Sequence, residues 1–341
     1  MIVVYSGLEA RHAPAAFLVR GQMEASPETP ARGAALLAAV RRRGDRIVAP
    51  DDSGLGPVSA VHAADYLDFL ESAWREWRKV GGAPEVIPNV HPARGLASMP
   101  SGIVGRAGFH QADTACPIGE HTWVAALSAA QCAAHAARLV HAGEPVAYAL
   151  SRPPGHHAFS DMAGGFCYLN NTAIAAEVLA RQGLRVAILD VDVHHGNGTQ
   201  AIFYRRRDVL HVSIHRDPGH YYPYFWGYGH ERGEADGVGF NLNLPQPPGT
   251  GDDAYGVALE DAKGAIRRFM PDALVVALGL DTFEGDPLQG MRITTGGFER
   301  IGASVAALGL PVVLVQEGGY PCPELGANLE HFLGGFEAGS R

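Results

Sequence analysis

The sequence predicts an α/β protein with a mainly parallel central sheet and helices on both faces. Short runs rich in β-branched residues alternate with alanine-rich segments in which apolar residues recur at helical spacing. This alternation is typical of a parallel sheet covered on two sides. Several apolar runs lead directly into Asp, His, Glu or Tyr, and ligand sites of such sheets form at the carboxyl ends of the strands. We expect one domain over residues 1–341.

The individual elements follow from length and periodicity. Buried strands are expected where short apolar runs occur: Ile2–Tyr5, Val146–Leu150, Arg185–Val191, Val209–Ile214, Ala273–Leu278 and Pro311–Gln316. Helices are expected where apolar residues recur every three to four positions over longer segments. These segments are Pro30–Arg43, Ala64–Lys79, Thr122–His141, Asn171–Arg181, Asp252–Phe269, Thr295–Leu308 and Glu324–Phe336.

Two segments do not follow the alternation. Residues 80–120 are rich in Gly and Pro without a clear period, and they exceed the roughly 12 to 15 residues of an ordinary connection. We expect an insertion loop there that binds substrate or contacts another subunit. Residues 215–239 place six aromatic side chains between glycines after a predicted strand. These aromatic residues form either a local cluster or the wall of a pocket.

Composition and charge restrict the classes of partner. The net charge of −9 and pI near 5.9 argue against nucleic acid, whose binding requires a basic face, and suit small cationic substrates better. The four cysteines are scattered without a CxxC pair, which fits neither a disulfide framework nor a zinc ribbon. Nowhere do about 18 apolar residues run together. We therefore expect a cytoplasmic protein without a membrane partner.

The most informative segment is DVDVHHGNG at residues 190–198. It places Asp190, Asp192 and His194 at alternate positions after an apolar run, and strand geometry sends alternate side chains to one face. A single Asp or His after a strand is more often a helix cap or a solvated loop residue. Three such groups in a buried location need a compensating partner. Since carboxylate and imidazole groups bind zinc at about 2 Å, the segment predicts a divalent-metal site.

Three other predicted strands also lead into titratable residues. One leads through Pro-Pro-Gly into His156 and His157, one into Asp281, and one through Glu-Gly-Gly into Tyr320. The histidine pair suits proton transfer, Asp281 suits a third metal ligand, and a phenol suits stabilisation of a developing oxyanion. Taken singly, each residue also has a structural interpretation as a packing, capping or turn residue. No GxSxG, P-loop or GxGxxG motif follows a strand, which disfavours serine-nucleophile and nucleotide chemistry.

Five motifs, in this order and spacing, resemble the zinc-dependent histone deacetylase superfamily, whose fold is arginase-like: RPPGHHA, GGFCYLNN, DVDVHHGNGTQ, LGLDTFEGDP and EGGY. The resemblance covers most of the chain from about residue 110 onward. The chain length, the segment FLESAW at residues 69–74 and the long loop before Thr122 look most like bacterial acetylpolyamine amidohydrolases. The resemblance therefore implies a single deacetylase-like catalytic domain.

The resemblance implies two metal sites. The zinc ligands, for one zinc per chain, would be Asp192, His194 and Asp281, with water and the substrate carbonyl completing the coordination. A structural potassium ion would be bound by Asp190, Ser213 and the backbone carbonyls of Asp192, His194 and Ile214. The sequence leaves open whether the catalytic ion in the cell is zinc or ferrous iron.

The resemblance also implies the catalytic roles. His157 would be the general base and acid, and His156, hydrogen-bonded to Asp190, would stay largely cationic. Asn197 would orient His157, where many first-class histone deacetylases carry aspartate. An amide fixes the ring without a full charge, so His157 should be less basic than in that class. Tyr320 would polarise the carbonyl and stabilise the oxyanion.

The residues implied to bind substrate are Phe166 and Tyr222 as the aromatic tunnel walls, Gly165 beside them and Leu288 at the rim. Polyamine deacetylases place acidic residues where the aligned positions here are Phe17, Val104 and Asp113. Only Asp113 keeps the charge. Its role as an anchor for a distal ammonium group rests on analogy, and the alternative is a solvated surface carboxylate.

The leading hypothesis is a zinc amidohydrolase that deacetylates small amines, most consistently acetylpolyamines, through a narrow tunnel completed by the insertion of a homodimer partner. The alternatives with the same chemistry are a protein acetyl-lysine deacetylase and a hydrolase of another small amide. A non-catalytic acetyl-ligand binder is disfavoured because the histidines, metal ligands and Tyr320 are all present. A binuclear manganese enzyme would need further ligands, which His195 and Asn197 do not obviously supply.

Overall fold

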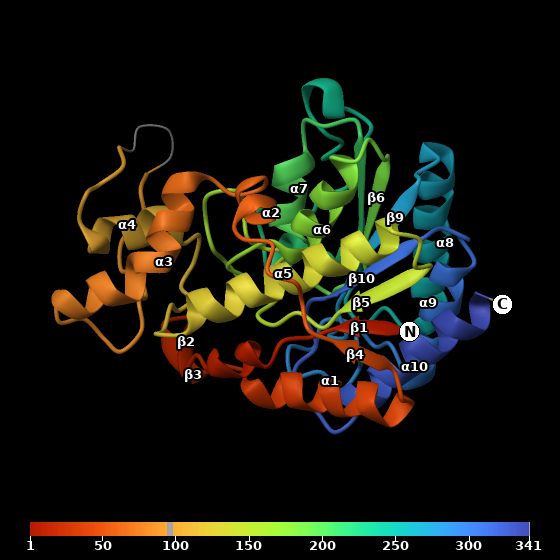
Figure 1. Cartoon of the computed structure of the whole chain (residues 1–341), viewed down its shortest axis with the longest axis horizontal. Coiled ribbons are helices and arrows are strands. Elements are labelled where there is room, and N and C mark those ends of the chain that lie inside the picture. Colours follow the sequence, from red (N-terminus) through yellow and green to blue (C-terminus); the bar gives the residue numbers. More distant parts are fainter. Residues whose placement is uncertain (94–97, 341) are drawn as a thin grey trace.

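The computed structural model describes residues 1–93 and 98–340 (Figure 1). At its centre lies an eight-stranded sheet with the order β4-β1-β5-β10-β9-β6-β7-β8, and each pair of neighbours is parallel. Its strands are β1 (Ile2–Val4), β4 (Arg46–Val48), β5 (Val146–Ala149), β6 (Val186–Asp190), β7 (Val209–Arg216), β8 (Asn241–Gln246), β9 (Ala273–Leu278) and β10 (Val312–Gln316). The predicted parallel α/β class is confirmed.

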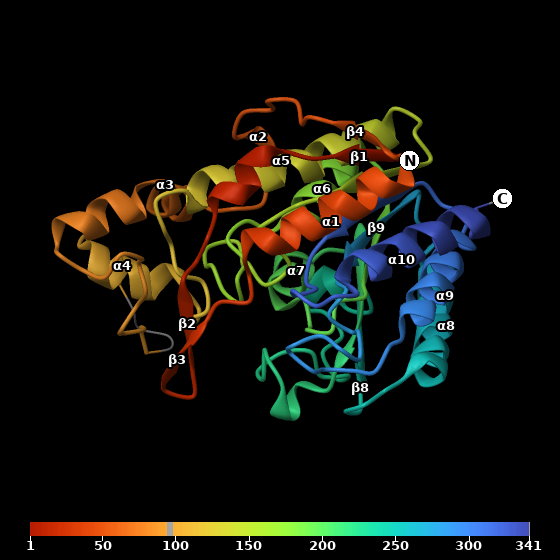
Figure 2. The same ribbon diagram turned by 90° about the horizontal axis from the view of Figure 1, so that it is seen from below.

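Helices cover both faces of this sheet, as Figures 1 and 2 show. One face packs against α5 (Thr122–His141), α6 (Asn171–Ala180) and α7 (Asn197–Phe203), and the other against α1 (Pro30–Arg43), α8 (Asp252–Phe269), α9 (Thr295–Ala306) and α10 (Leu325–Gly339). Successive strand residues alternate between the two cores, because strand side chains point alternately to opposite faces. In β5, for example, Ala147 packs with α5 and α6, whereas Tyr148 packs on the opposite side.

The elements that the sequence did not predict are short or weakly patterned. β4 has only three residues, and β8 reads NLNLPQ, in which polar residues alternate with apolar ones and a proline follows. Both are edge strands, which need less apolar surface than central ones and tolerate proline. The short helices α2 (Gly56–Ser59) and α7 were also not predicted. The bounds of α1, α5 and α8 agree with the prediction.

The insertion is more regular than expected. It contains α4 (Ile103–His110), which packs against α3 (Ala64–Lys79), and a bridge between Val86 and Ile118. These helices extend from one end of the molecule, near the hairpin of β2 (Ala16–Val19) and β3 (Gln22–Ala25) (Figure 1). The many Gly and Pro residues around α4 weaken the apolar periodicity from which a helix is predicted. Among the described residues, no helix combines the length and apolar character needed to cross a bilayer.

Candidate active site

The site lies at the carboxyl edge of the sheet, where four adjacent strands end. β5, β10, β9 and β6 are consecutive in the strand order. β5 leads into the loop of His156 and His157, β10 into that of Tyr320, β9 into Asp281, and β6 into residues 190–194. Because parallel strands end at the same edge, segments far apart in the sequence meet there.

Asp192, His194 and Asp281 form a buried group whose donor atoms converge. One donor atom from each lies within 4.8 Å of the others. His194 Nδ1 is 3.1 Å from Asp192 Oδ1 and 3.2 Å from Asp281 Oδ2. Backbone amides hold both carboxylates: Gly318 N–H donates to Asp192 Oδ2 at 2.7 Å, and Val193 N–H donates to Asp281 Oδ1 at 3.0 Å. These three side chains form a candidate metal centre.

The donor chemistry of this group fits a cation. Asp192 and Asp281 place two carboxylates in a fully buried location, where like charges repel and an uncompensated charge is costly. Asp281 Oδ2 accepts no hydrogen bond within the part of the chain that the structure describes. The Nδ1 of His194 carries at most one hydrogen, so it cannot satisfy both facing carboxylate oxygens. Two carboxylates and one imidazole are the donors of a catalytic zinc site with open positions.

Gly318 keeps the space in front of the two carboxylates open, which gives a first prediction. A Cβ at this position would clash with Asp281 Oδ2 and Asp192 Oδ2. Gly318→Ala should therefore reduce metal content, measured by inductively coupled plasma mass spectrometry, by more than about half, because misplaced ligands weaken binding. Gly256→Ala is the matched control, since a Cβ there meets nothing within 4 Å. Full metal content in Gly318→Ala would contradict this account of the centre.

Asp190 does not join this group, which corrects the interpretation from strand alternation. β6 ends at Asp190, and Asp192 and His194 lie in the following loop, so strand geometry no longer aligns the three side chains. Asp190 Oδ2 instead lies 2.9 Å from His156 Nδ1, and its Oδ1 accepts a hydrogen bond from Asp192 N–H at 3.1 Å. The alternating pattern was informative, but only two of its three members face Asp281.

His156 and His157 lie beside the candidate metal centre, and the centroids of their rings are 4.0 Å apart. His157 Nδ1 is 2.6 Å from Asn197 Oδ1 at the start of α7. An amide oxygen only accepts, so Nδ1 donates and Nε2 keeps its lone pair. Burial and the neighbouring His156 and His194 hold the pKa of His157 well below its usual value. Burial alone would lower the pKa of His156 as well, but Asp192 and Asp190 outweigh it and raise that pKa to about 10.

Two charged side chains bind the backbone at and before Tyr320. Asp286 Oδ2 accepts a hydrogen bond from Tyr320 N–H at 2.9 Å. The guanidinium of Arg32, on α1, donates to Gly319 O at 2.5 Å and to Glu317 O. Burial raises the pKa of the Tyr320 phenol well above its ordinary value, although Arg32 acts in the opposite direction. The phenol therefore keeps its proton and can donate a hydrogen bond.

Sequence reasoning assigned no function to Asp286 or Arg32. Asp286 lies within the quoted motif LGLDTFEGDP, where its spacing from Asp281 was the available signal. Arg32 is fully buried in the first turn of α1, and a sequence cannot distinguish such an arginine from an exposed one.

Aromatic side chains lie around the candidate centre. The ring of Phe166 lies 5.7 Å from that of Tyr320 and 5.3 Å from that of Phe17, and the ring of Tyr222 lies 4.9 Å from that of His157. Gly165 has φ +50°, and a Cβ there would lie 2.6 Å from His157 Cδ2. Only glycine fits this position.

Tyr221, a second member of the aromatic loop, also lies at the site. The ring of Tyr221 stacks on that of His194 with centroids 5.0 Å apart, and its hydroxyl donates to the carbonyl of half-buried Leu288 at 3.1 Å. Residues 215–239 thus supply Tyr221 and Tyr222 to the site. By contrast, Tyr224 and Phe225 of the same loop are exposed.

Asp113 lies next to this wall and is already hydrogen-bonded. Tyr222 hydroxyl donates to its Oδ2 at 2.6 Å, and the backbone amides of Gly165 and Ala115 donate to the same carboxylate. Val104, the other aligned position in the insertion, lies on α4 and is exposed. Of the three aligned positions Phe17, Val104 and Asp113, the structure therefore places Phe17 beside Phe166 and Asp113 beside Tyr222.

The residues implied for potassium binding lie behind the histidine pair. Asp190 and Ser213 are directly opposite each other in the register of β6 and β7, and Ile214 follows. All three are buried. Ser213 Oγ lies 2.8 Å from His215 Nδ1.

With this geometry in place, comparison with known proteins gives the family. The model of the histone deacetylase domain matches residues 26–336. The chain belongs to the histone deacetylase family. It is 47% identical over 340 residues to a protein from Burkholderia pseudomallei named acetylpolyamine amidohydrolase, with 99% of each chain covered. It is 44% identical, over the full length of both chains, to acetylpolyamine amidohydrolase 1 of Pseudomonas aeruginosa.

The structural comparison agrees with the sequence comparison. The crystal structure of an acetylpolyamine aminohydrolase from Burkholderia pseudomallei matches with a TM-score of 0.95 at 47% identity, covering 99% of each chain. These matches confirm the resemblance that the five motifs indicated. They also extend it to the amino-terminal third of the chain, where the motif evidence was sparse.

Proposed function

We propose that this histone deacetylase-family protein is a zinc-dependent amidohydrolase that removes the acetyl group from acetylated polyamines. The observation that carries the proposal is the convergence of Asp192, His194 and Asp281 beside a histidine with a free Nε2 and a buried, protonated tyrosine. The names of the full-length relatives support the polyamine class.

Asp192, His194 and Asp281 would hold one metal ion. Held there, zinc would supply Lewis acidity toward the acetyl carbonyl and would lower the pKa of water toward neutral pH. The two carboxylates keep their positions through the amides of Gly318 and Val193. Rigid placement of this kind lowers the reorganisation that the reaction requires.

His157 would transfer the protons. Its Nδ1 hydrogen is directed to Asn197, so Nε2 is available to accept a proton from the attacking water and later donates it to the leaving amine. The lowered pKa keeps the ring neutral and ready to accept. His156, paired with Asp190, would carry a positive charge beside it and would stabilise the negatively charged transition state.

Tyr320 would donate a hydrogen bond to the carbonyl oxygen as that oxygen gains negative charge. Phe166 and Tyr222, with Phe17 beside them, would line a passage suited to a slender methylene chain. A potassium ion bound by Asp190 and Ser213 would neutralise the buried carboxylate of Asp190 and hold the loop of His156 and His157 in position. Gly165 and Leu288 would complete the wall and rim.

The test is a substrate panel with the purified protein: acetylated putrescine, cadaverine and spermidine against acetyl-lysine peptides. The proposal predicts a kcat/KM for at least one acetylated diamine or triamine that exceeds the value for every peptide. Higher kcat/KM values for peptides would instead assign a protein acetyl-lysine deacetylase.

Two further expectations stay predictions: a homodimer formed through residues 80–120, and a cytoplasmic location. Light scattering tests the homodimer.

Asp113 would attract the distal ammonium group of the substrate. Asp113→Asn removes the charge but keeps an acceptor for the Tyr222 hydroxyl. It should raise KM for cationic acetylated amines by about threefold to fivefold, the range of a partly exposed ion pair, without raising KM for a neutral acetylamide. Steady-state kinetics on both substrates check this. An equal rise in KM for the cationic and the neutral substrate would contradict the charge role and leave Asp113 only as a hydrogen-bond partner that positions Tyr222.

A further inference from the structure

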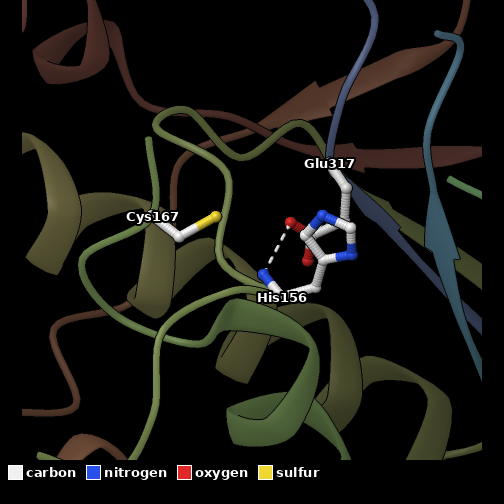
Figure 3. Close-up of side chains that lie close together, drawn as sticks. All are labelled: His156, Cys167 and Glu317. Carbon is white, nitrogen blue, oxygen red and sulfur yellow. Dashed lines mark hydrogen bonds between the residues drawn. The ribbon is translucent and has the colours of Figure 1, made fainter. Parts of the chain in front are cut away.

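Glu317 is a buried carboxylate that the mechanism above does not use. It follows directly after β10, is fully buried, and precedes the glycines of the Tyr320 loop. Its Oε2 accepts hydrogen bonds from the backbone amides of Gly155 at 2.6 Å and His156 at 3.0 Å. Its Oε1 accepts one from Thr172 Oγ at 2.6 Å. Figure 3 shows the carboxylate of Glu317 directed at the backbone nitrogen of His156.

These contacts argue against a second metal site at this place. His156, Cys167 and Glu317 lie close enough together to hold an ion (Figure 3). However, both oxygens of Glu317 already accept hydrogen bonds, and His156 Nδ1 faces Asp190. Burial raises the pKa of Cys167 well above its usual value, which disfavours the thiolate that would bind a metal. The group is better explained by what Glu317 does to the backbone.

The histidine loop is also held by the start of α6 and the residue that precedes it. Asn171 Nδ2 donates to Pro153 O at 3.0 Å, and Asn170 Nδ2 donates to Ala158 O at 2.9 Å. Gly155 packs so closely against this helix that a Cβ there would clash with Asn171 N. Residues 153–158 are therefore fixed by the start of α6, and Glu317, which also contacts Thr172 of that helix, supplies the contact from the end of β10.

We propose that Glu317 is a positioning residue that anchors the His156–His157 loop to strand β10. Its hydrogen bonds to the amides of Gly155 and His156 fix the backbone directly before His157. They thereby set the distance between His157 and the candidate metal centre. The inference rests on the proposed function. Glu317 would also couple the two catalytic loops, because the residues that follow it lead directly to Tyr320.

The test separates length from charge at this position. Glu317→Gln keeps the side-chain length, with its oxygen placed for the two amides and its nitrogen for Thr172; Glu317→Asp keeps the charge but is one methylene too short. We expect Glu317→Asp to lower kcat by about 100-fold, the cost of a displacement near 1 Å, with KM and metal content unchanged. Glu317→Gln should keep kcat within about threefold of the parent.

A greater loss in Glu317→Gln than in Glu317→Asp would overturn the anchoring role and assign the effect to charge. Equal losses in both variants would overturn it as well, because side-chain length would then matter no more than charge. Parent-like kcat in Glu317→Asp would also overturn it. If Glu317→Asp does not fold, Thr172→Val and Thr172→Ser decide: Val removes the third hydrogen bond and should lower kcat by about tenfold, whereas Ser keeps it. An inactive parent protein would refute the proposed function itself and is thereby distinguished from a failure of this inference.

Discussion

His157→Ala is expected to lower kcat on an acetylated polyamine by about 10²–10⁴-fold, the range that a general acid–base residue contributes. The reason is the geometry of the ring: Asn197 holds Nδ1 at 2.6 Å, burial keeps the ring neutral, and Nε2 is free to accept a proton. Steady-state kinetics give kcat, and mass spectrometry gives the metal content of the same sample. Metal content should match the parent because His157 is not one of the converging ligands.

Two further variants make this result specific. His141→Ala removes an exposed histidine at the end of α5 and should leave kcat unchanged. Asn197→Ala should lower kcat less than His157→Ala, since the base is still present but its tautomer and orientation are no longer fixed. Substantial hydrolysis by His157→Ala would assign proton transfer to another group, and His156 would be the next to test.

Tyr320→Phe is expected to lower kcat by about 10²–10³-fold, the usual cost of losing one oxyanion donor. The substitution removes only the hydroxyl, so the ring should keep its contact with Phe166 at 5.7 Å and the backbone its hydrogen bond to Asp286. The raised pKa of the phenol means that the parent enzyme donates a hydrogen bond throughout the neutral pH range.

The effect of Tyr320→Phe should fall on kcat rather than on KM, because a hydrogen bond to an oxyanion is made mainly in the transition state. Kinetics over a range of acetylated amine concentrations separate the two constants, and the metal content should equal that of the parent. Turnover near the parent value would reject the oxyanion role and leave Tyr320 as a packing residue against Phe166 and Arg32.

The central fold was predictable from the sequence, since the buried strands are short apolar runs and the covering helices are longer periodic segments. β6 and β9, at the centre of the sheet, have fully buried residues throughout, and such runs are conspicuous in a sequence. The edge strand β8 is hard to recognise in the sequence, because only part of its surface is covered and polar residues occupy alternate positions. The helix α4 depends on contacts with α3 rather than on a strong local pattern.

The candidate site was predictable where its residues follow strand ends, because parallel topology brings those ends together. Asp192, His194, Asp281 and Tyr320 belong to this class. Arg32 lies on α1 and does not belong to it. Glu317 does follow β10, but its role, like that of Arg32, depends on which backbone atoms the side chain faces. A sequence does not specify that an arginine on α1 contacts the carbonyls of the Tyr320 loop, or that a glutamate after β10 accepts hydrogen bonds from the loop after β5.

The metal content of the active protein tests the central claim most directly. Purified protein would be depleted with a chelator and titrated with zinc while hydrolysis of an acetylated polyamine and bound metal are both measured. The account predicts that activity rises in proportion to metal up to one ion per chain, and that Asp281→Asn lowers the amount bound. Full activity in metal-free protein, or a requirement for two manganese ions per chain, would contradict a single centre held by Asp192, His194 and Asp281.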